Sequence, residues 1–194
     1  RDPACRASRS CRGSSRAYTT AQMAQLVNDV MEQDVPPVQV RLGGATDIGG
    51  GRENQDTWFS WTDPAGSGST VFGVLDGHGR EVGKLAATAG RDGILAWLDD
   101  AANMESLRLN PTEGFAIMFA HAHSCVKEAF RESLTSAGWT VEDTPEGYLL
   151  KRRQAMQPWQ CVHGGTSCSV LALIDGQRLV TANVGDSSAL LGRV

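Results

Sequence analysis

The sequence has no apolar run long enough to cross a membrane, no repeated unit and few aromatic side chains. A membrane-spanning helix needs about 18 or more consecutive apolar residues, and repeat proteins show self-similarity at a fixed period. Neither feature occurs in the 194 residues, of which 41% are apolar and 6% aromatic. A chain of this length and composition can bury one hydrophobic core. We therefore expect a single folded domain and no membrane partner.

Cysteine is scarce and irregularly spaced. A disulfide-stabilised secreted domain would show an even number of cysteines at regular spacings, and a structural zinc site would show close pairs. This chain has five, with no paired C-x-x-C: Cys5, Cys11, Cys125, Cys161 and Cys168. We therefore expect reduced thiols in an intracellular protein.

Acidic residues exceed basic ones, and the imbalance is uneven along the chain. The whole chain carries 18 basic and 22 acidic side chains, a net charge of −4. Residues 1–17 hold five of the arginines and one acid, Asp2, so the remainder carries about −8. Nucleic-acid binding needs clustered Lys and Arg to neutralise phosphates. The charge therefore predicts no nucleic-acid partner and favours cations or cationic substrates.

The first 17 residues are rich in Arg and Ser and do not begin with Met. This composition is typical of an organelle transit peptide, of a disordered tail, or of a linker within a longer protein. We expect residues 1–17 to be disordered and residues 18–194 to form one domain. We expect the cytoplasm or nucleus as the compartment, with organelle targeting left open.

Hydrophobic periodicity predicts helices and strands in separate blocks. Helices are expected over residues 19–34, 81–103 and 112–137. Strands are expected over 38–42, 56–61, 71–75, 168–174, 178–183 and 188–194, with hairpins joining 56–61 to 71–75 and, through Asp175-Gly176-Gln177, 168–174 to 178–183. Residues 138–161 are polar and carry no predicted element. Locally paired strands with helices in a block indicate an α+β fold with antiparallel sheet.

Polar residues occur where the predicted strands begin or end. Asp56 precedes one strand, and Asp76-Gly77-His78 follows the next. Thr166, after two glycines, precedes a third strand, and Asp186 follows the fourth. Strand ends that meet at one edge of a sheet place distant side chains on a rigid support. Converging aspartates repel one another unless a cation or proton neutralises them, and their hard oxygens suit Mg²⁺ or Mn²⁺.

The Asp76-Gly77-His78 run has a chemical and an ordinary interpretation. Gly77 has no Cβ, so its carbonyl can approach a metal beside the Asp76 carboxylate. His78 would then be a proton donor with a pKa near working pH. An Asp-Gly pair after a strand is more often a simple turn, and a single histidine is usually structural. The functional interpretation depends on all of these motifs occurring in this order. No single motif would support it alone.

That set resembles the metal-dependent protein phosphatases, the PPM or type 2C serine/threonine phosphatase family. The matching stretches are, in order, "GRENQDTWFSW", "VFGVLDGHGREVG", "GGTSCSVLALIDG" and "LVTANVGDSSALLGRV", which span about Thr46 to Val194. The resemblance implies a partial α-β-β-α sandwich, with two antiparallel sheets flanked by helices. It also implies hydrolysis of phosphoserine and phosphothreonine in protein substrates by a water bridging two Mg²⁺ or Mn²⁺ ions.

The resemblance implies metal ligands at three positions. Asp76 matches the carboxylate that bridges both metals, and Gly77 matches a backbone carbonyl ligand. Asp186 matches an aspartate associated with a further, weaker metal. The family completes its site with two more aspartates, whereas no acid follows Asp186 here. We therefore expect this chain to be the N-terminal portion of a catalytic domain, with its C-terminal half missing, and to be inactive alone. We expect the intact protein to be a monomer.

Other matched residues would handle protons and phosphate. His78 matches the histidine that protonates the departing oxygen, and Asp56 matches an aspartate that holds metal-bound water. Thr166 matches a small hydroxyl residue near the metals, and Arg52, one residue later than usual, is assigned to phosphate binding. Where many members have Glu, this chain has Gln55.

Two alternatives remain open. A pseudophosphatase that serves as an interaction module would tolerate Gln55 and the shifted Arg52. A zinc site would have to use His121, His123 and Cys125, of which the first and last share a helix face and His123 points elsewhere. The phosphatase interpretation accounts for more of the motifs than either alternative.

Overall fold

A computed structural model describes residues 40–50, 52–80 and 82–192. The chain divides into two units, Arg1–Pro36 and Pro37–Val194, and every described residue lies in the second. The predicted helix over 19–34 and the 17/18 boundary therefore lie outside the described residues. None of the described helices is long and apolar enough to cross a membrane.

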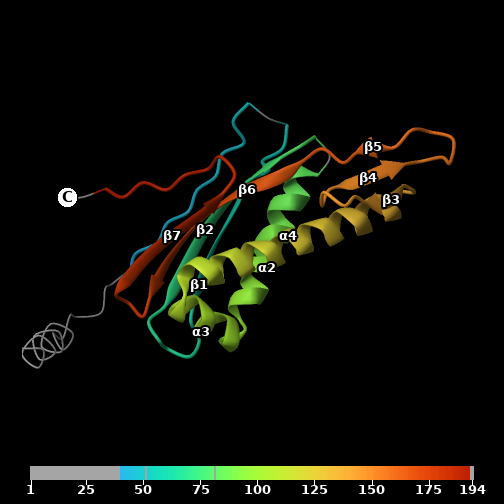
Figure 1. Ribbon diagram of the computed structural model, residues 1–194. Coiled ribbons are helices and arrows are strands. Elements are labelled where there is room, and N and C mark those ends of the chain that lie inside the picture. The colour runs from blue at the N-terminus through green and yellow to red at the C-terminus, as the bar shows by residue number, and fades with distance from the viewer. Residues whose placement is uncertain (1–39, 51, 81, 193–194) are drawn as a thin grey trace, which may run out of the picture. The chain divides into compact units, whose positions relative to one another are not determined.

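Four antiparallel strands form the main sheet, in the order β1-β2-β6-β7 (Figure 1). The strands are β1 (Thr57–Thr62), β2 (Thr70–His78), β6 (Gly165–Ile174) and β7 (Arg178–Val184). Strands β1 and β2 pair from Thr57↔Leu75 to Thr62↔Thr70. The predicted hairpin between the first two strands is confirmed.

The second predicted hairpin, which joins β6 to β7, is also confirmed. The conformation of its two-residue turn favours this hairpin. Asp175 and Gly176 have φ of 55° and 67°, and Gln177 N–H donates to the Ile174 carbonyl at 3.1 Å. Two positive φ angles in a two-residue turn match the right-handed twist of the flanking strands. The buried Ser69 hydroxyl accepts the Asp175 N–H at 3.0 Å, which ties this turn to the β1–β2 loop.

The helical block contains three helices where two were predicted: α2 (Gly83–Leu98), α3 (Ala101–Leu109) and α4 (Pro111–Ser136). The single helix expected over 81–103 is therefore wrong. The break falls at Asp99-Asp100, where Asp99 accepts the Trp61 indole N–H at 2.8 Å. Asp100 caps α3 by accepting the Ala102 and Asn103 N–H groups. The helix expected over 112–137 is confirmed as α4, which begins with Pro111 at its first turn.

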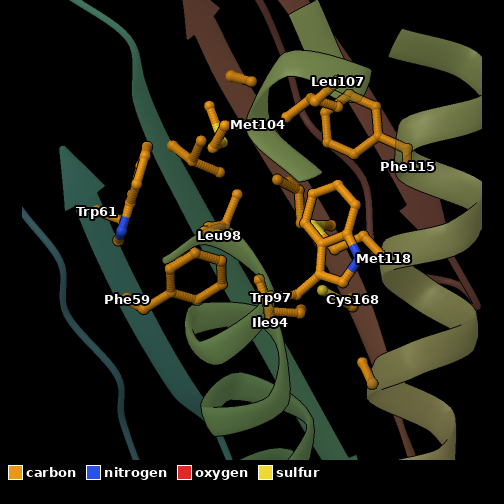
Figure 2. Close-up of a cluster of buried hydrophobic side chains, with 14 of the residues drawn as sticks. Phe59, Trp61, Ile94, Trp97, Leu98, Met104, Leu107, Phe115, Met118 and Cys168 are labelled. Atoms are coloured by element: carbon orange, nitrogen blue, oxygen red, sulfur yellow. The ribbon is translucent and has the colours of Figure 1, made fainter. Parts of the chain in front are cut away.

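The helices pack on one face of the main sheet and enclose the core (Figure 2). Alternate strand residues point into this core, among them Leu75 of β2 and Val170 of β6, which are 1% and 0% exposed. The helices contribute large apolar side chains, including Trp97, Leu107 and Met118. The α+β fold with antiparallel sheet is thereby confirmed, and none of the described helices packs on the opposite face of the sheet.

A second, three-stranded sheet occupies the region where no element was predicted. It consists of β3 (Thr140–Asp143), β4 (Leu149–Arg152) and β5 (Gln160–Cys161), all antiparallel. Leu149 anchors it to a small core with Val126 and Phe130 of α4. Its strands are only two to four residues long, which is too short for a period-two pattern to stand out in the sequence.

Two predicted strands are not formed in the described residues. Residues 40–42 and 188–192 have no strand assignment, whereas residues 38, 39, 193 and 194 lie outside the described range. Leu190 and Leu191 are 97% and 78% exposed, so nothing in the described part of the chain pairs with that segment. Apolar composition alone cannot make a strand without a neighbour to complete its hydrogen bonds.

Candidate functional site

The four sequence motifs, which contain Asp56, Asp76-Gly77-His78, Thr166 and Asp186, lie at one edge of the main sheet. Because all four strands are antiparallel, β1 and β6 begin where β2 and β7 end. Thr57 pairs with Leu75, which places Asp56 beside Asp76. Asp76 pairs in turn with Ser167 of β6, and a Cβ on Gly185 would lie 2.7 Å from the Ser167 Cβ. The convergence that we expected from strand ends is therefore present.

Three predicted site residues line one hollow on the uncovered face of the sheet. The hollow has a volume of about 1100 Å³, and its acidic lining residues are Asp56, Asp76 and Asp186. The rest of the lining includes apolar side chains such as Trp58 and Val74, which pair across β1 and β2. The acids thus lie at the end of a hollow that is otherwise largely apolar.

Asp56 and Asp76 interact directly. Partial burial raises the pKa of the Asp56 carboxyl above its usual value, and the charge of Asp76, together with a hydrogen bond to that side chain, raises it further. Lys84, in the first turn of α2, lowers the pKa of Asp56 and donates from Nζ to the Asp56 carbonyl at 2.9 Å. Two adjacent carboxylates with one nearby ammonium favour a bound cation or a shared proton.

The donor set fits a divalent cation only in part. Oxygen ligands suit Mg²⁺ or Mn²⁺, and Asp56 and Asp76 supply carboxylates close to each other. Within the described residues, however, no group of three or more His, Cys, Asp or Glu is placed to hold a metal ion. Asp186 lines the same hollow without joining that pair into a cluster. The described residues therefore supply two neighbouring carboxylates and no complete set of metal ligands.

Gly77 is packed against backbone on both sides. A Cβ there would come within 2.3 Å of the Gly83 carbonyl oxygen and 2.7 Å of the Gln55 carbonyl oxygen. The Gln55 side chain continues this contact, since its Nε2 donates to the Gly79 carbonyl at 2.9 Å. Glycine at position 77 is thus required by close packing, and Gln55 holds the segment before β1 against the turn after β2.

The other three predicted site residues are not among those that line the aspartates' hollow. His78 lines two neighbouring hollows and is absent from the lining around Asp76. The Thr166 hydroxyl lies 3.0 Å from the Asp76 carbonyl oxygen and 2.8 Å from that of Ser167, so it bonds to backbone. Arg52 is exposed and lines none of these three hollows. Their roles in proton transfer and phosphate binding stay predictions.

Sequence reasoning missed two residues that shape this edge, Lys84 and Ser187. Lys84 follows the D-G-H-G run by five residues, and a single lysine gives no signal by itself. The Ser187 hydroxyl forms a short hydrogen bond with that of Ser167, which joins the segment after β7 to β6. The run Gly185-Asp186-Ser187, directly after a predicted strand, is the sequence feature from which Ser187 could have been predicted.

The zinc alternative has only two neighbouring ligands in the structure. The Cys125 Sγ lies 3.6 Å from His121 Nε2 on one face of α4, whereas His123 lines a hollow under the sheet. This matches the expectation that only two ligands converge, and a structural zinc site needs four.

Comparison with known proteins identifies the family. The profile of the family described as Protein phosphatase 2C matches residues 69–194, which is most of the chain. The chain belongs to the protein phosphatase 2C family. The matched range contains Asp76, Gly77, His78, Thr166 and Asp186 and begins after Asp56.

Curated protein phosphatase 2C relatives come from Arabidopsis thaliana. Probable protein phosphatase 2C 52 is 30% identical over 72% of this chain and 30% of the relative. Probable protein phosphatase 2C 72 is 28% identical over 84% of this chain and 42% of the relative. Probable protein phosphatase 2C 33 is 28% identical over 80% of this chain and 39% of the relative. The chain thus spans less than half the length of these relatives. No solved structure matches it significantly.

Proposed function

We propose that this chain forms part of a metal-dependent serine/threonine protein phosphatase. The observation that supports the proposal most directly is the adjacent pair Asp56 and Asp76 at a sheet edge, within a chain of the protein phosphatase 2C family. Mutually repelling carboxylates at an exposed edge destabilise the isolated fold. A cation bound between them would offset this repulsion.

Each site residue has a distinct task in this proposal. Asp76, the Gly77 carbonyl and Asp186 would hold Mg²⁺ or Mn²⁺, and Arg52 and Thr166 would contact the phosphate. Bound divalent ions lower the pKa of water and offset charge on the phosphoryl oxygens. Asp56, which lies beside Asp76, would hold a water at this site. His78 donates a proton to the oxygen that leaves with serine or threonine.

Activity is tested on the whole protein that contains this chain, with a phosphoserine peptide as substrate. We expect hydrolysis only with added Mg²⁺ or Mn²⁺. Asp76→Asn abolishes turnover, and His78→Gln lowers kcat by about 10²–10⁴-fold, because loss of a general acid costs that much. Full activity in excess chelator, or a near-normal rate for Asp76→Asn, would refute the proposal.

The 194-residue chain by itself is proposed to be inactive and to bind divalent ions weakly. Mg²⁺ gives up its waters reluctantly, and the described residues bring only two carboxylates together. Calorimetric titration with Mn²⁺ should show no tight site, and a phosphopeptide assay should show no turnover. Tight binding of two ions per chain would contradict this expectation.

A pseudophosphatase is the second candidate, and the Gln55 contact favours it. The Gln55 amide is engaged with the Gly79 carbonyl, so it offers no charge to a metal where many relatives have Glu. Under this alternative the whole protein binds phosphopeptides without turnover at any metal concentration. The same phosphopeptide assay therefore separates the two candidates.

A further inference from the structure

A separate hollow lies on the helix-covered side of the main sheet and has a volume of about 290 Å³. Its described lining comes from the ends of β2, β6 and β7, from α2 and α4, and from the loops beside the small sheet. It shares none of its described lining residues with the aspartates' hollow. Protein interiors contain few voids larger than a water molecule, so this space exceeds what imperfect packing leaves. We call it the helix-side hollow.

The walls of the helix-side hollow are largely apolar. Leu75 of β2, which lines it, is 1% exposed. The Thr166 hydroxyl already bonds to backbone carbonyls, and the Lys127 ammonium is paired with the Asp143 carboxylate at 2.8 Å. Burying a charged ligand among such walls would be costly. The ligand that fits is therefore uncharged.

Aromatic side chains and a thiol make up much of this lining. Five ring-bearing side chains contribute to it: Phe119, Phe130, Tyr148, His78 and His123. Aromatic rings pack favourably against one another in offset or edge-to-face arrangements. Burial raises the pKa of the Cys168 thiol to about 12, so this lining residue is uncharged at pH 7, and sulfur contacts with ring edges are favourable. An aromatic ligand thus suits these walls better than an aliphatic one.

Gly90 keeps part of this space open. It lies within α2, where glycine is less favourable than alanine. A Cβ there would lie 3.1 Å from Leu75 Cδ2 and 3.6 Å from the Cγ2 atoms of Thr166 and Val126, all of which belong to lining residues. A side chain at position 90 would therefore point in among residues from β2, β6 and α4.

The size of the helix-side hollow limits its ligand. An apolar cavity of roughly 150 Å³ holds one benzene-sized ring, so about 290 Å³ is enough for two fused rings. Tyr148 and Val184 line the hollow and are 47% and 48% exposed, so it opens to solvent beside them. A peptide segment suits this space poorly, because its backbone N–H and C=O groups need hydrogen-bond partners.

We propose that the helix-side hollow binds a small uncharged molecule with two fused aromatic rings. The site does not depend on the proposed phosphatase activity, because none of the described residues around the three aspartates lines it. A bound molecule would lie against His78, the residue to which we assign proton donation.

Two substitutions that fill the hollow test its position, and each has a control. Ala122→Val adds two carbons at a lining position of α4 that is 7% exposed. Ala120→Val makes the same change at an exposed position of α4 that is not among the described lining residues. Gly90→Ala is the smaller filling change. Val74→Lys alters the opposite face of the sheet and shows whether the probe binds there instead.

Isothermal titration calorimetry of the 194-residue chain with 2-naphthol measures binding. We expect one molecule per chain and a higher melting temperature at saturation, because a ligand that binds only the folded state stabilises it. The probe 2-naphthoate carries the same two rings with a carboxylate, and it should bind roughly tenfold more weakly because its charge is costly to bury. Ala122→Val should weaken 2-naphthol binding about fivefold or more, and Gly90→Ala about twofold, because the added carbons occupy the ligand's space.

Ala120→Val and Val74→Lys should keep the affinity for 2-naphthol within about twofold, because distant sites act independently. Circular dichroism confirms that each variant folds, and Gly90→Ala decides the outcome if Ala122→Val does not fold. Absence of binding up to the solubility limit of 2-naphthol would overturn the inference. Loss of binding in Val74→Lys alone, or equal losses in Ala120→Val and Ala122→Val, would also overturn it. Equal affinity for 2-naphthoate would show that the site does not select uncharged ligands.

Discussion

Charge at a single residue, Asp56, links the site to the stability of the fold. Its folded-state pKa is raised by partial burial and by Asp76. Deprotonation is therefore less favourable in the folded chain than in the unfolded chain. The charge costs stability above the folded pKa, and this cost disappears as pH falls below the usual value near 3.8.

Asp56→Asn should therefore raise the melting temperature at pH 7 in the absence of divalent ions, with the gain vanishing near pH 3.5. Differential scanning calorimetry across pH measures this. Asp63→Asn is the control of opposite sign. Its pKa is lowered, chiefly by a hydrogen bond from Ser67 and by the Ala65 N–H, so its loss should destabilise at pH 7. A lower melting temperature for Asp56→Asn would contradict the assigned repulsion.

Among the contacts between secondary-structure elements, the close approach of β2 to the start of α2 is the one that tolerates least change. It depends on the absence of a side chain at Gly77, where a Cβ would lie 2.3 Å from the Gly83 carbonyl oxygen. Backbone on both sides cannot move aside as a flexible side chain would. The helix therefore begins next to the D-G-H-G turn only because residue 77 is glycine.

Gly77→Ala should lower the free energy of unfolding by about 2–4 kcal/mol, as overpacking against a rigid neighbour does. Urea denaturation followed by circular dichroism measures this. Gly50→Ala is the matched control, because a Cβ there meets nothing within 4 Å, and its effect should stay within about 0.5 kcal/mol. Equal stability of the two variants would show that β2 and α2 do not meet as described.

In the described part of the folded unit, one face of the main sheet has no helix packed on it. On that face Trp58 and Val74 pair across β1 and β2 and are 44% and 50% exposed, and they line the same hollow as Leu171 and Leu179. Contiguous apolar surface of this kind promotes association. The 194-residue chain should therefore self-associate in solution.

Val74→Lys should shift the sedimentation-velocity profile towards monomer, because it places a charge in the middle of the apolar face. Leu109→Lys is the control, since Leu109 is 77% exposed at the end of α3 and lies outside that hollow. A chain that is monomeric at every concentration, or equal effects of the two variants, would contradict the assignment of this face.

The sequence by itself determined the elements whose signals are local. The Asp175-Gly176 turn predicted the β6–β7 hairpin. The continuous apolar periodicity that follows Pro111 predicted α4. Strand ends predicted that Asp56, Asp76 and Asp186 would lie at one edge of the sheet, where they line one hollow, because antiparallel strands share their edges. Each of these inferences depends on residues that are close in the chain or on a general rule of sheets.

Only the tertiary structure decided the rest. It split the predicted helix at Asp99, where the indole of Trp61 from a distant strand binds. It built the small sheet from strands too short to recognise in the sequence. It also placed His78 in different hollows from Asp76. These outcomes depend on contacts between residues far apart in the sequence, and local periodicity and turn chemistry contain no information about such contacts.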